Sequence, residues 1–185
     1  MTQQAHNRSG QASVRPTIYT IGHSNHPFEK FVELLHLHEI NLLVDTRSKP
    51  QSRWPQFNLR YLSKELPHNG ITYSWMGDAL GGKPADPSLY GDDEKPDFAA
   101  IARTAPFNEA VSRLVNGCKA ARIAVMCGEG DPRGCHRRGL ITPALLKRDV
   151  QVVHILPDGS LVSEADLAQE DAEKTRQLAL LPARP

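Results

Sequence analysis

Thiol, imidazole and carboxylate groups gather in one short stretch of the chain. Cys127 and Cys135 lie eight positions apart, Glu129 lies between them, and His136 follows Cys135 directly. A cysteine becomes a nucleophile when nearby groups stabilise its thiolate, and a neighbouring histidine or carboxylate can move the proton. The sequence predicts that Cys127 or Cys135 is either a nucleophile or a wall of the pocket, and Cys127 is the candidate catalytic cysteine. Glu129 and His136 are the predicted acid/base groups.

Two further stretches carry polar groups directly after apolar or β-branched runs. His23 and Ser24 follow one such run, and Asp45 and Arg47 follow another. In an open α/β sheet, ligands bind outside the carboxyl ends of the parallel strands, so residues that follow strands are candidates for a site. Glu129 or Asp45 is the expected general acid/base, and His136 or His23 is the expected proton shuttle. Ser24 is expected to contact the ligand.

Arginines at these positions are expected to bind an anion. Arg47 follows a predicted strand, whereas Arg137 and Arg138 lie in the first turn of a predicted helix, where a cation is unfavourable unless an anion also binds. Guanidinium groups bind carboxylates and phosphates through two parallel hydrogen bonds, and we expect Arg47 and Arg137 to clamp the ligand in this way. We therefore predict a small anionic or nucleotide-like substrate. Its predicted ligand-binding residues are His23, Ser24, Arg47, Cys135 and Arg137.

Structural interpretations of the same residues stay open. His23 can be a core histidine that bonds a carbonyl, and Cys127 can pack as a small apolar side chain. Asp45 and Arg47 can form a structural ion pair. Three strand ends that all carry reactive groups nevertheless favour a site, because turns that only connect elements are usually rich in Gly, Asn and Ser.

A phosphatase is disfavoured by the residues around the first of these cysteines. Cys127 and Arg133 are spaced as C-x5-R between a strand and a helix, which resembles the phosphate loop of cysteine phosphatases. Met126 stands where those enzymes usually have histidine, and Glu129 and Asp131 would repel a phosphate in the loop. The C-x5-R spacing is therefore only a weak indication of a cysteine phosphatase.

Zinc is an alternative ligand of the same region. Cys127, Cys135, His136 and His23 are residues of the types that bind zinc. No pair of them has the C-x2-4-C spacing of a zinc site, and two adjacent helical residues point about 100° apart. We therefore assign no metal and no cofactor to the sequence.

A basic and aromatic segment supports an alternative function. Its positive charges suit phosphates and its rings suit bases, so it favours contact with a nucleotide or a nucleic acid. The rings can instead pack the segment onto the sheet while the basic groups stay in solvent. The two hypotheses are thus an enzyme of the hydrolase or transferase type and a non-catalytic nucleotide or nucleic-acid binding module. The residues of the segment are Arg47, Lys49, Arg53, Trp54, Phe57, Arg60 and Tyr61.

Hydrophobic periodicity predicts the elements that position these residues. Apolar and alternating runs predict strands at residues 17–21, 42–44, 71–75, 123–126, 150–156 and 160–162. Helical spacing predicts helices at 28–39, 59–66, 98–103 and 107–118, one that carries Ile141, Ala144 and Leu145, and a last one opened by a capping box at Ser163 and Asp166. This alternation predicts an α/β fold: a single three-layer domain with a mostly parallel sheet flanked by helices and a short antiparallel edge strand near the C-terminus.

Three segments are expected to lie outside the regular elements. Residues 1–16 are expected to be a disordered leader and 182–185 a frayed end, with the single domain spanning 17–181. Between Met76 and Asp97 there is no periodicity, and glycine and proline are frequent. We predict that this long loop closes over the site and excludes water.

Composition limits the classes of function. The 185 residues include 22 Lys and Arg against 21 Asp and Glu, so a net charge of +1 creates no global field toward nucleic acid or an anionic membrane. Three cysteines without a CxxC pair do not fit a secreted disulfide framework, and Cys118 is expected to pack in a helix. No apolar stretch approaches the roughly 18 residues of a membrane span. We expect a cytoplasmic protein without a membrane partner, and the sequence indicates no oligomeric state.

Five motifs occur in order along the chain. They are Thr20-Ile21-Gly22-His23-Ser24, Val44-Asp45 with Arg47, Pro50 and Ser52, Gly70-Ile71-Thr72-Tyr73, Leu80-Gly81-Gly82, and Cys127 with Glu129, Asp131-Pro132 and Cys135-His136-Arg137. From about Thr17 to about Val162 the chain resembles the domain-of-unknown-function 488 family, although Thr46 stands where that family usually has Val or Ile. The resemblance implies a single α/β domain of bacterial and archaeal cytoplasmic type. It implies no reaction, because the family has none assigned.

Overall fold

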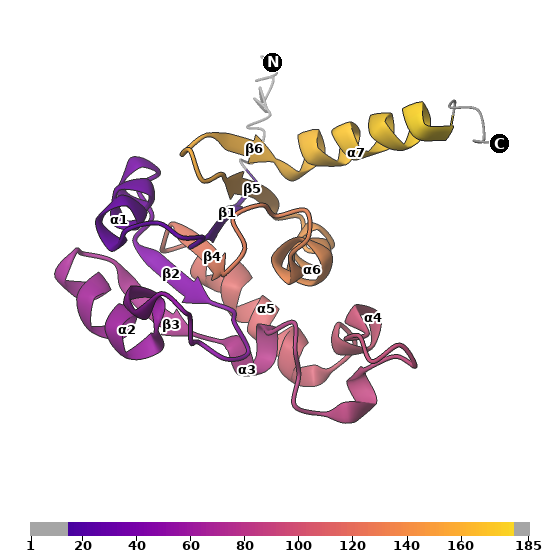
Figure 1. The fold of residues 1–185 in the computed structure, drawn as a ribbon, viewed down its shortest axis with the longest axis horizontal. Helices are drawn as coiled ribbons and strands as arrows, with labels where there is room; N and C mark the ends of the chain where they lie inside the picture. Colours follow the sequence, from indigo (N-terminus) through magenta and orange to yellow (C-terminus); the bar gives the residue numbers. More distant parts are fainter. Residues whose placement is uncertain (1–14, 180–185) are drawn as a thin grey trace, which may run out of the picture.

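A six-stranded sheet forms the centre of the molecule in the computed structural model, which describes residues 15–179 (Figure 1). The strands are β1 (Thr17–Gly22), β2 (Leu42–Asp45), β3 (Thr72–Trp75), β4 (Ile123–Cys127), β5 (Gln151–Ile155) and β6 (Leu161–Ser163). Their order in the sheet is β3-β2-β4-β1-β5-β6. All neighbours are parallel except β5 and β6, which are antiparallel. The edge strand near the C-terminus is therefore antiparallel, as predicted.

Helices connect the strands and cover both faces of the sheet (Figure 1). The α-helices are α1 (Phe28–Leu37), α2 (Leu59–His68), α3 (Gly77–Leu80), α4 (Phe98–Ile101), α5 (Ala105–Gly117), α6 (Thr142–Leu146) and α7 (Glu164–Ala179). Two short 3-10 helices are η1 (Pro55–Phe57) and η2 (Pro87–Leu89), and η3 (Arg137–Ile141) is a π-helical turn. This three-layer α/β arrangement confirms the predicted fold class.

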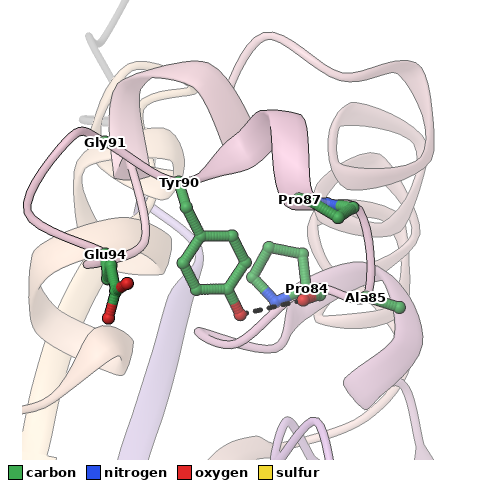
Figure 2. Close-up of a pocket in the computed structure, with 6 residues that line it drawn as sticks. All are labelled: Pro84, Ala85, Pro87, Tyr90, Gly91 and Glu94. Atoms are coloured by element: carbon green, nitrogen blue, oxygen red, sulfur yellow. Dashed lines mark hydrogen bonds between the residues drawn. The ribbon is translucent and has the colours of Figure 1, made fainter.

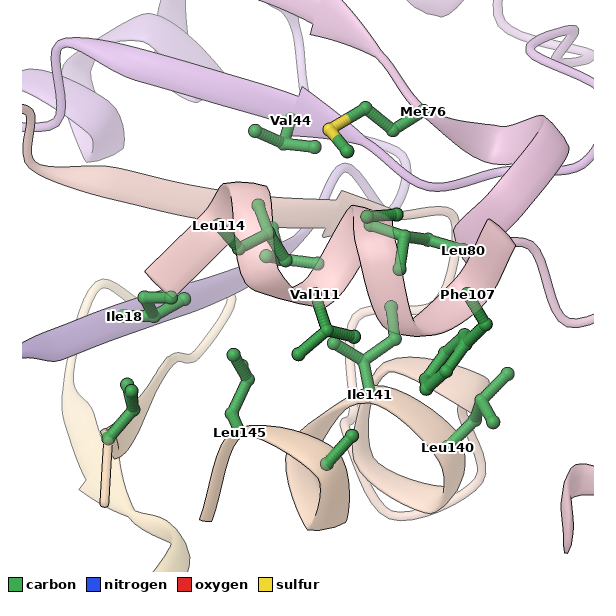
Figure 3. Packing of buried hydrophobic residues seen from close by; sticks show 14 of the residues in the cluster. Ile18, Val44, Met76, Leu80, Phe107, Val111, Leu114, Leu140, Ile141 and Leu145 are labelled. Carbon is green, nitrogen blue, oxygen red and sulfur yellow. The ribbon is translucent and has the colours of Figure 1, made fainter. Parts of the chain in front are cut away.

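The core has two halves, one on each face of the sheet. Successive side chains of a strand point to opposite faces, so Val125 of β4 belongs to one half and Met126 to the other. The first half packs against α3, α5, η3 and α6, and Figure 3 shows Val111 and Leu114 of α5 gathered there with Ile141. The second half packs against α1 and α2.

The carboxyl ends of three central strands lie level with one another. Gly22 of β1 pairs with Cys127 of β4, and Asp45 of β2 pairs with Met126 of β4. After β1 and β2 the chain turns to α1 and α2 on one face, whereas after β4 it turns to η3 and α6 on the other. Ligand sites in open α/β sheets form at such switch points. The strand order therefore brings all three predicted strand ends to one place.

The predicted elements are present, with ends that differ from the prediction by at most two residues. The backbone N–H of Asp166 donates to Ser163 Oγ at 3.1 Å, so the predicted cap opens α7. One correction concerns the long loop after β3, which contains the single turns α3 and η2. Single turns are too short to show a hydrophobic period, which is why the sequence indicated no structure there.

Parts of the domain prediction fall outside the described residues. Residues 1–14 of the predicted leader and the predicted end at 182–185 are not among them. Within residues 15–179, no helix combines the length and the apolar character that crossing a membrane requires.

Candidate functional site

Residues 127–136, called the thiol loop below, lie directly against the end of β1. A Cβ atom on Gly22 would lie 1.7 Å from the carbonyl oxygen of Glu129, so only glycine allows this approach. The backbone N–H of His23 donates to the carbonyl oxygen of Cys127 at 3.0 Å. These contacts place the loop after β4 beside the residues that follow β1.

Two sulfur atoms are in contact at the ends of the thiol loop. Cys127 Sγ and Cys135 Sγ are 2.8 Å apart, and both residues are buried. Cys135 Sγ also lies 3.3 Å from Glu129 Oε2 and 3.7 Å from His136 Nδ1. Three of the four predicted catalytic residues thus meet around the sulfur of Cys135.

Arg137 holds the thiol loop from inside the protein. Its side chain is completely buried, and Nη1 donates to Cys127 Sγ at 2.8 Å. The guanidinium also donates to the carbonyl oxygen of Glu129 and, at 2.7 Å, to that of Gly130. Protein atoms therefore engage both terminal nitrogens of Arg137, whereas its buried Nε has no hydrogen-bond partner within residues 15–179, so the expected clamp on a ligand stays a prediction. Its geometry suits positioning of the loop and stabilisation of a nearby thiolate.

The neighbouring Arg138 is held by carboxylates of α7. Its Nε donates to both carboxylate oxygens of Glu164 at 3.0 Å, and its Nη1 donates to Asp171 Oδ2 at 2.6 Å. These protein carboxylates supply the anions expected beside a cation at the start of a helix. A bound substrate is therefore not needed to explain Arg138.

Thr46 determines which nitrogen of His136 faces the sulfur. Thr46 Oγ1 donates to the carbonyl oxygen of Met126 at 3.0 Å, so it accepts from His136 Nε2 at 3.2 Å. The Thr46 carbonyl oxygen accepts from the same nitrogen at 3.1 Å. Because both contacts require the proton on Nε2, Nδ1 is free to accept the proton of the Cys135 thiol. The sequence marked Thr46 only as a departure from the family motif, so its part in the site was missed.

The segment after β3 fixes the position of His136. A Cβ atom on Gly82 would lie 2.6 Å from His136 Cβ, so the glycine packs directly on this side chain. The backbone N–H of Lys83 donates to Ser48 Oγ at 2.9 Å, which ties the same segment to the loop after β2. The first part of the predicted lid therefore lies against the site.

The rest of that segment folds around a hollow of its own. The lining residues are Pro84, Ala85, Pro87, Tyr90, Gly91 and Glu94 (Figure 2). Tyr90 donates its hydroxyl to the carbonyl oxygen of Pro84 at 2.9 Å. None of the predicted site residues lines this hollow, so it is separate from the thiols.

The two contacting thiols have opposite proton affinities. The hydrogen bond with Cys127, together with His136 and the charge of Arg137, lowers the pKa of Cys135 to about 6, although burial opposes this shift. Burial and the contact with Cys135 raise the pKa of Cys127 well above its ordinary value, and Arg137 offsets only part of the increase. At neutral pH the pair therefore keeps a proton on Cys127 and a thiolate on Cys135.

Glu129 stays ionised beside this thiolate. Burial raises its pKa, but hydrogen bonds from both thiols and from its own backbone, with the charge of His136, lower the pKa overall. A carboxyl group with a lowered pKa has no proton to donate at neutral pH. Of the predicted acid/base roles, the structure favours a hydrogen-bond acceptor for Glu129.

Asp45 and Arg47 form a second, buried cluster. Arg47 Nε donates to Asp45 Oδ1 at 2.9 Å, and Nη2 donates to Asp45 Oδ2 at 2.6 Å and to the carbonyl oxygen of Phe57 at 2.7 Å. Tyr73 donates its hydroxyl to Asp45 Oδ2 at 2.7 Å, and burial and this carboxylate raise the pKa of Tyr73. The ion pair that the sequence left open is formed. It engages the Asp45 carboxylate that was expected to act as an acid or base, and it adds Tyr73, which was predicted only as a strand residue.

His23 belongs to the same cluster. Its Nδ1 donates to the carbonyl oxygen of Ser24 at 2.8 Å, so Nε2 accepts from Arg47 Nη1 at 3.3 Å. The ring stacks on Phe57, with centroids 4.3 Å apart. Burial, assisted by the charge of Arg47, lowers the pKa of His23 to about 4. A neutral ring with both nitrogens engaged orients Arg47 and is poorly placed to shuttle protons.

Arg47 and Ser24 keep part of their hydrogen-bonding capacity. Four of the five N–H groups of Arg47 have partners, which leaves one on Nη1 for a ligand. Ser24 adopts a φ of 51°, and its backbone N–H donates to the carbonyl oxygen of Gly128 at 3.0 Å. Its hydroxyl, half-buried beside the thiol loop, donates to Asn25 Oδ1 at 3.3 Å.

Cys127, Glu129 and Cys135 are the residues that could hold a metal ion. Their ligand atoms lie within 4.8 Å of one another, and residues 15–179 contain no other such group. The zinc alternative also required His136 and His23, which lie outside this group. Arg137 adds a positive charge next to Cys127 Sγ, which favours free thiols over a bound cation.

The basic and aromatic segment is divided between the interior and the surface. Phe57 is completely buried and Arg47 is engaged in its ion pair, so neither is presented to a large external partner. The Arg53 guanidinium lies 5.5 Å from the Trp54 ring centroid, and Tyr61 is 39% exposed. The binding-module hypothesis keeps only the outer members of the segment, which are Lys49, Arg53, Trp54, Arg60 and Tyr61.

The comparison with protein families covers most of these residues. The sequence profile described as domain of unknown function DUF488 matches residues 27–142. That span holds four of the five motifs, and only the motif at 20–24 precedes it. No curated protein and no solved structure matches the chain. Because the matched span exceeds half of the 185 residues, the chain belongs to the DUF488 family.

Proposed function

We propose that this protein is a cysteine-dependent enzyme that acts on a small anionic or nucleotide-like substrate at the carboxyl ends of β1, β2 and β4. The observation that carries the proposal is the position of Cys135 Sγ, which lies 3.7 Å from His136 Nδ1 and 3.3 Å from Glu129 Oε2. A nucleophile, a base and a group that orients the base are the parts of nucleophilic catalysis. Here Thr46 is the orienting group.

The reaction begins with attack by Cys135 on an electrophilic atom of the substrate. As the bond from sulfur to substrate forms, His136 Nδ1 holds the proton that the thiol has released. The bond to the leaving group breaks, and Nδ1 returns this proton to the leaving group. Water then releases the product in a hydrolase, or a second substrate takes the group in a transferase.

The remaining groups of the thiol loop position the nucleophile. Arg137 fixes Cys127 and the carbonyl groups of the loop, so the sulfur of Cys135 has one arrangement. Its buried charge also favours the thiolate. Glu129 Oε2, 3.3 Å from Cys135 Sγ, accepts a hydrogen bond from this residue while it is still a thiol, before its proton is released.

Arg47 is the group that supports an anionic substrate. Asp45 and His23 hold its guanidinium in place, and one N–H on Nη1 remains for the ligand. Asp45 and His23 therefore act as positioning residues in this proposal. Ser24 supplies a hydroxyl from the adjacent loop.

Acyl transfer from activated esters tests the proposal. Full-length protein is mixed with the p-nitrophenyl ester of succinate, which is anionic, or of acetate, which is neutral. We expect a burst of one nitrophenolate per chain and a thioester at Cys135, with the anionic ester favoured after correction for its rate with free cysteine. The burst should disappear in Cys135→Ser and persist in Cys118→Ser, since Cys118 lies in the helix region of α5 and donates to a backbone carbonyl.

Three results would overturn the proposal. One is the absence of any burst in the parent protein. A burst that persists in Cys135→Ser would remove Cys135 as the nucleophile. A corrected preference for the neutral ester would remove the anionic substrate class. None of these results depends on knowing the natural substrate.

A further inference from the structure

Cys127 forms no bond to the substrate in the reaction proposed above, yet it keeps a thiol in contact with the nucleophile. The two sulfur atoms are 2.8 Å apart, and a disulfide bond is about 2.05 Å long, so bond formation requires an approach of about 0.8 Å. Nothing lies within 4 Å of the position that a Cβ atom on Gly134 would take. The residue before Cys135 is therefore not packed against other side chains on that side.

We propose that Cys127 and Cys135 form an intramolecular disulfide when a peroxide oxidises Cys135, with Cys127 as the resolving thiol. This inference rests on the proposed function in that Cys135 supplies the nucleophile in both reactions. It goes beyond that function because it assigns a second class of reactant to the site and a chemical role to Cys127.

The oxidation proceeds in two steps. The Cys135 thiolate attacks one oxygen of hydrogen peroxide, so an S–O bond forms, the O–O bond breaks, and hydroxide leaves with a sulfenic acid on Cys135. The sulfur of Cys127 then attacks the sulfur of the sulfenic acid. The S–S bond forms, the S–O bond breaks, and the departing oxygen takes the proton of Cys127 and leaves as water. The two sulfurs together lose two electrons, and the peroxide gains them.

The surroundings of the two sulfurs suit these different roles. Cys135 has Glu129 and His136 as polar neighbours, whereas Cys127 is completely buried and contacts Arg137. The thiolate form that reacts with peroxide is therefore on the sulfur nearer the surface. Cys135 is only 4% exposed, so a small peroxide reaches it more easily than a bulky disulfide does.

Cys118 offers a matched control within the same chain. Its thiol donates to the carbonyl oxygen of Val115 at 3.1 Å, and burial raises its pKa. Cys118 does not contact Cys127, Cys135 or their polar neighbours, so its thiol should react with peroxide far more slowly than Cys135. Its replacement by serine leaves only the two thiols of interest.

The test treats full-length Cys118→Ser protein with an equimolar amount of hydrogen peroxide. We expect the thiols that titrate after unfolding to fall from two to none, the mass to fall by two hydrogens, and a Cys127–Cys135 linked peptide to appear. Dithiothreitol should restore both thiols. In a variant that also carries Cys127→Ser, dimedone should trap the sulfenic acid on Cys135. With Cys135→Ser instead, Cys127 should keep its thiol.

Several outcomes would overturn the inference. One is a stable sulfenic acid on Cys135 while Cys127 is present and reduced, and another is oxidation that begins at Cys127 in the Cys135→Ser variant. A protein that shows the nitrophenolate burst but forms no disulfide would refute the inference and leave the proposed function standing. A protein that forms the disulfide but shows no burst would refute the proposed function alone.

Discussion

Replacement of Cys127 tests the origin of the reactive thiolate at Cys135. The largest contribution to the low pKa of Cys135 is the hydrogen bond with Cys127 Sγ. Cys127→Ala removes this donor, whereas Cys127→Ser keeps a hydroxyl that can donate in its place. We expect Cys127→Ala to raise the pKa of Cys135 by at least about one unit, toward the ordinary value of about 8.5. Cys127→Ser should change it by less than about half a unit.

The largest change in alkylation rate that Cys127→Ala can cause follows from the pKa values of Cys135 in the parent and in the variant. The Cys135 pKa of about 6 makes roughly a quarter of the thiol ionised at pH 5.5, against about 0.1% for a pKa of about 8.5. The thiolate of the variant is roughly 13-fold more nucleophilic, for a Brønsted coefficient of about 0.45. Alkylation should therefore be up to about 20-fold slower than in the parent at pH 5.5 and up to about 7-fold faster at pH 8.5.

The variant should thus react more slowly than the parent at low pH and faster at high pH. Rates of alkylation by iodoacetamide between about pH 4.5 and about pH 9 measure this change of order. All proteins carry Cys118→Ser, and mass mapping of the adduct confirms that Cys135 is the residue modified. A Cys127→Ala profile that coincides with the Cys127→Ser profile, with its midpoint still near 6, would show that the Cys127 hydrogen bond does not set the pKa.

Three further perturbations address the framework of the site. Asp45→Asn leaves a buried guanidinium without its countercharge and should lower the free energy of unfolding by about 3–5 kcal/mol, measured in urea; a change below about 1 kcal/mol would contradict the ion pair. The pKa of His23 is lowered to about 4 in the folded state, so the unfolded chain binds more protons between about pH 6.5 and pH 4 and the parent loses stability as the pH falls through this range. His23→Gln should flatten that slope, and equal slopes in urea titrations at several pH values would disprove it. Gly22→Ala places a Cβ atom 1.7 Å from a backbone oxygen and should cost about 3 kcal/mol or more, whereas Gly134→Ala meets nothing within 4 Å and should be nearly neutral; equal thermal midpoints for the two variants would refute this contrast.

The elements of the fold could be predicted because each is encoded locally. Ile123–Met126 is a short apolar run, and Phe31 and Leu35 recur at helical spacing, so their local structure follows from neighbouring residues. The position of β4 between β1 and β2 could not be predicted. Strand order depends on which distant faces pack together, and periodicity within one segment carries no information about that choice.

The sequence predicted which residues gather at the site better than it predicted which side chains contact one another there. The rule that ligands bind at strand ends selected the thiol loop and the residues after β1 and β2, and the structure brings them together. It did not separate the thiol cluster from the ion pair, because side-chain directions decide that Arg137 turns inward to carbonyl groups while Arg47 turns to Asp45. The role of Thr46 depends on a contact with His136, 90 positions away, and no local pattern signals it.

Because Arg137 holds the carbonyl groups of the thiol loop, the backbone course of the loop depends little on most of the loop's own side chains. The carbonyl groups of Glu129 and Gly130 face the buried guanidinium, and a trans peptide then directs the following N–H groups away from it. Outward positions of the loop include Arg133, which is exposed and pairs with Glu170 of α7, and Gly134, where a Cβ atom would meet nothing within 4 Å. Exchange of these outer residues would alter what approaches the sulfurs while the backbone beneath keeps its course. In the proposed enzyme, the loop is thus a permissive place for directed evolution of substrate preference, provided that Arg137 is retained.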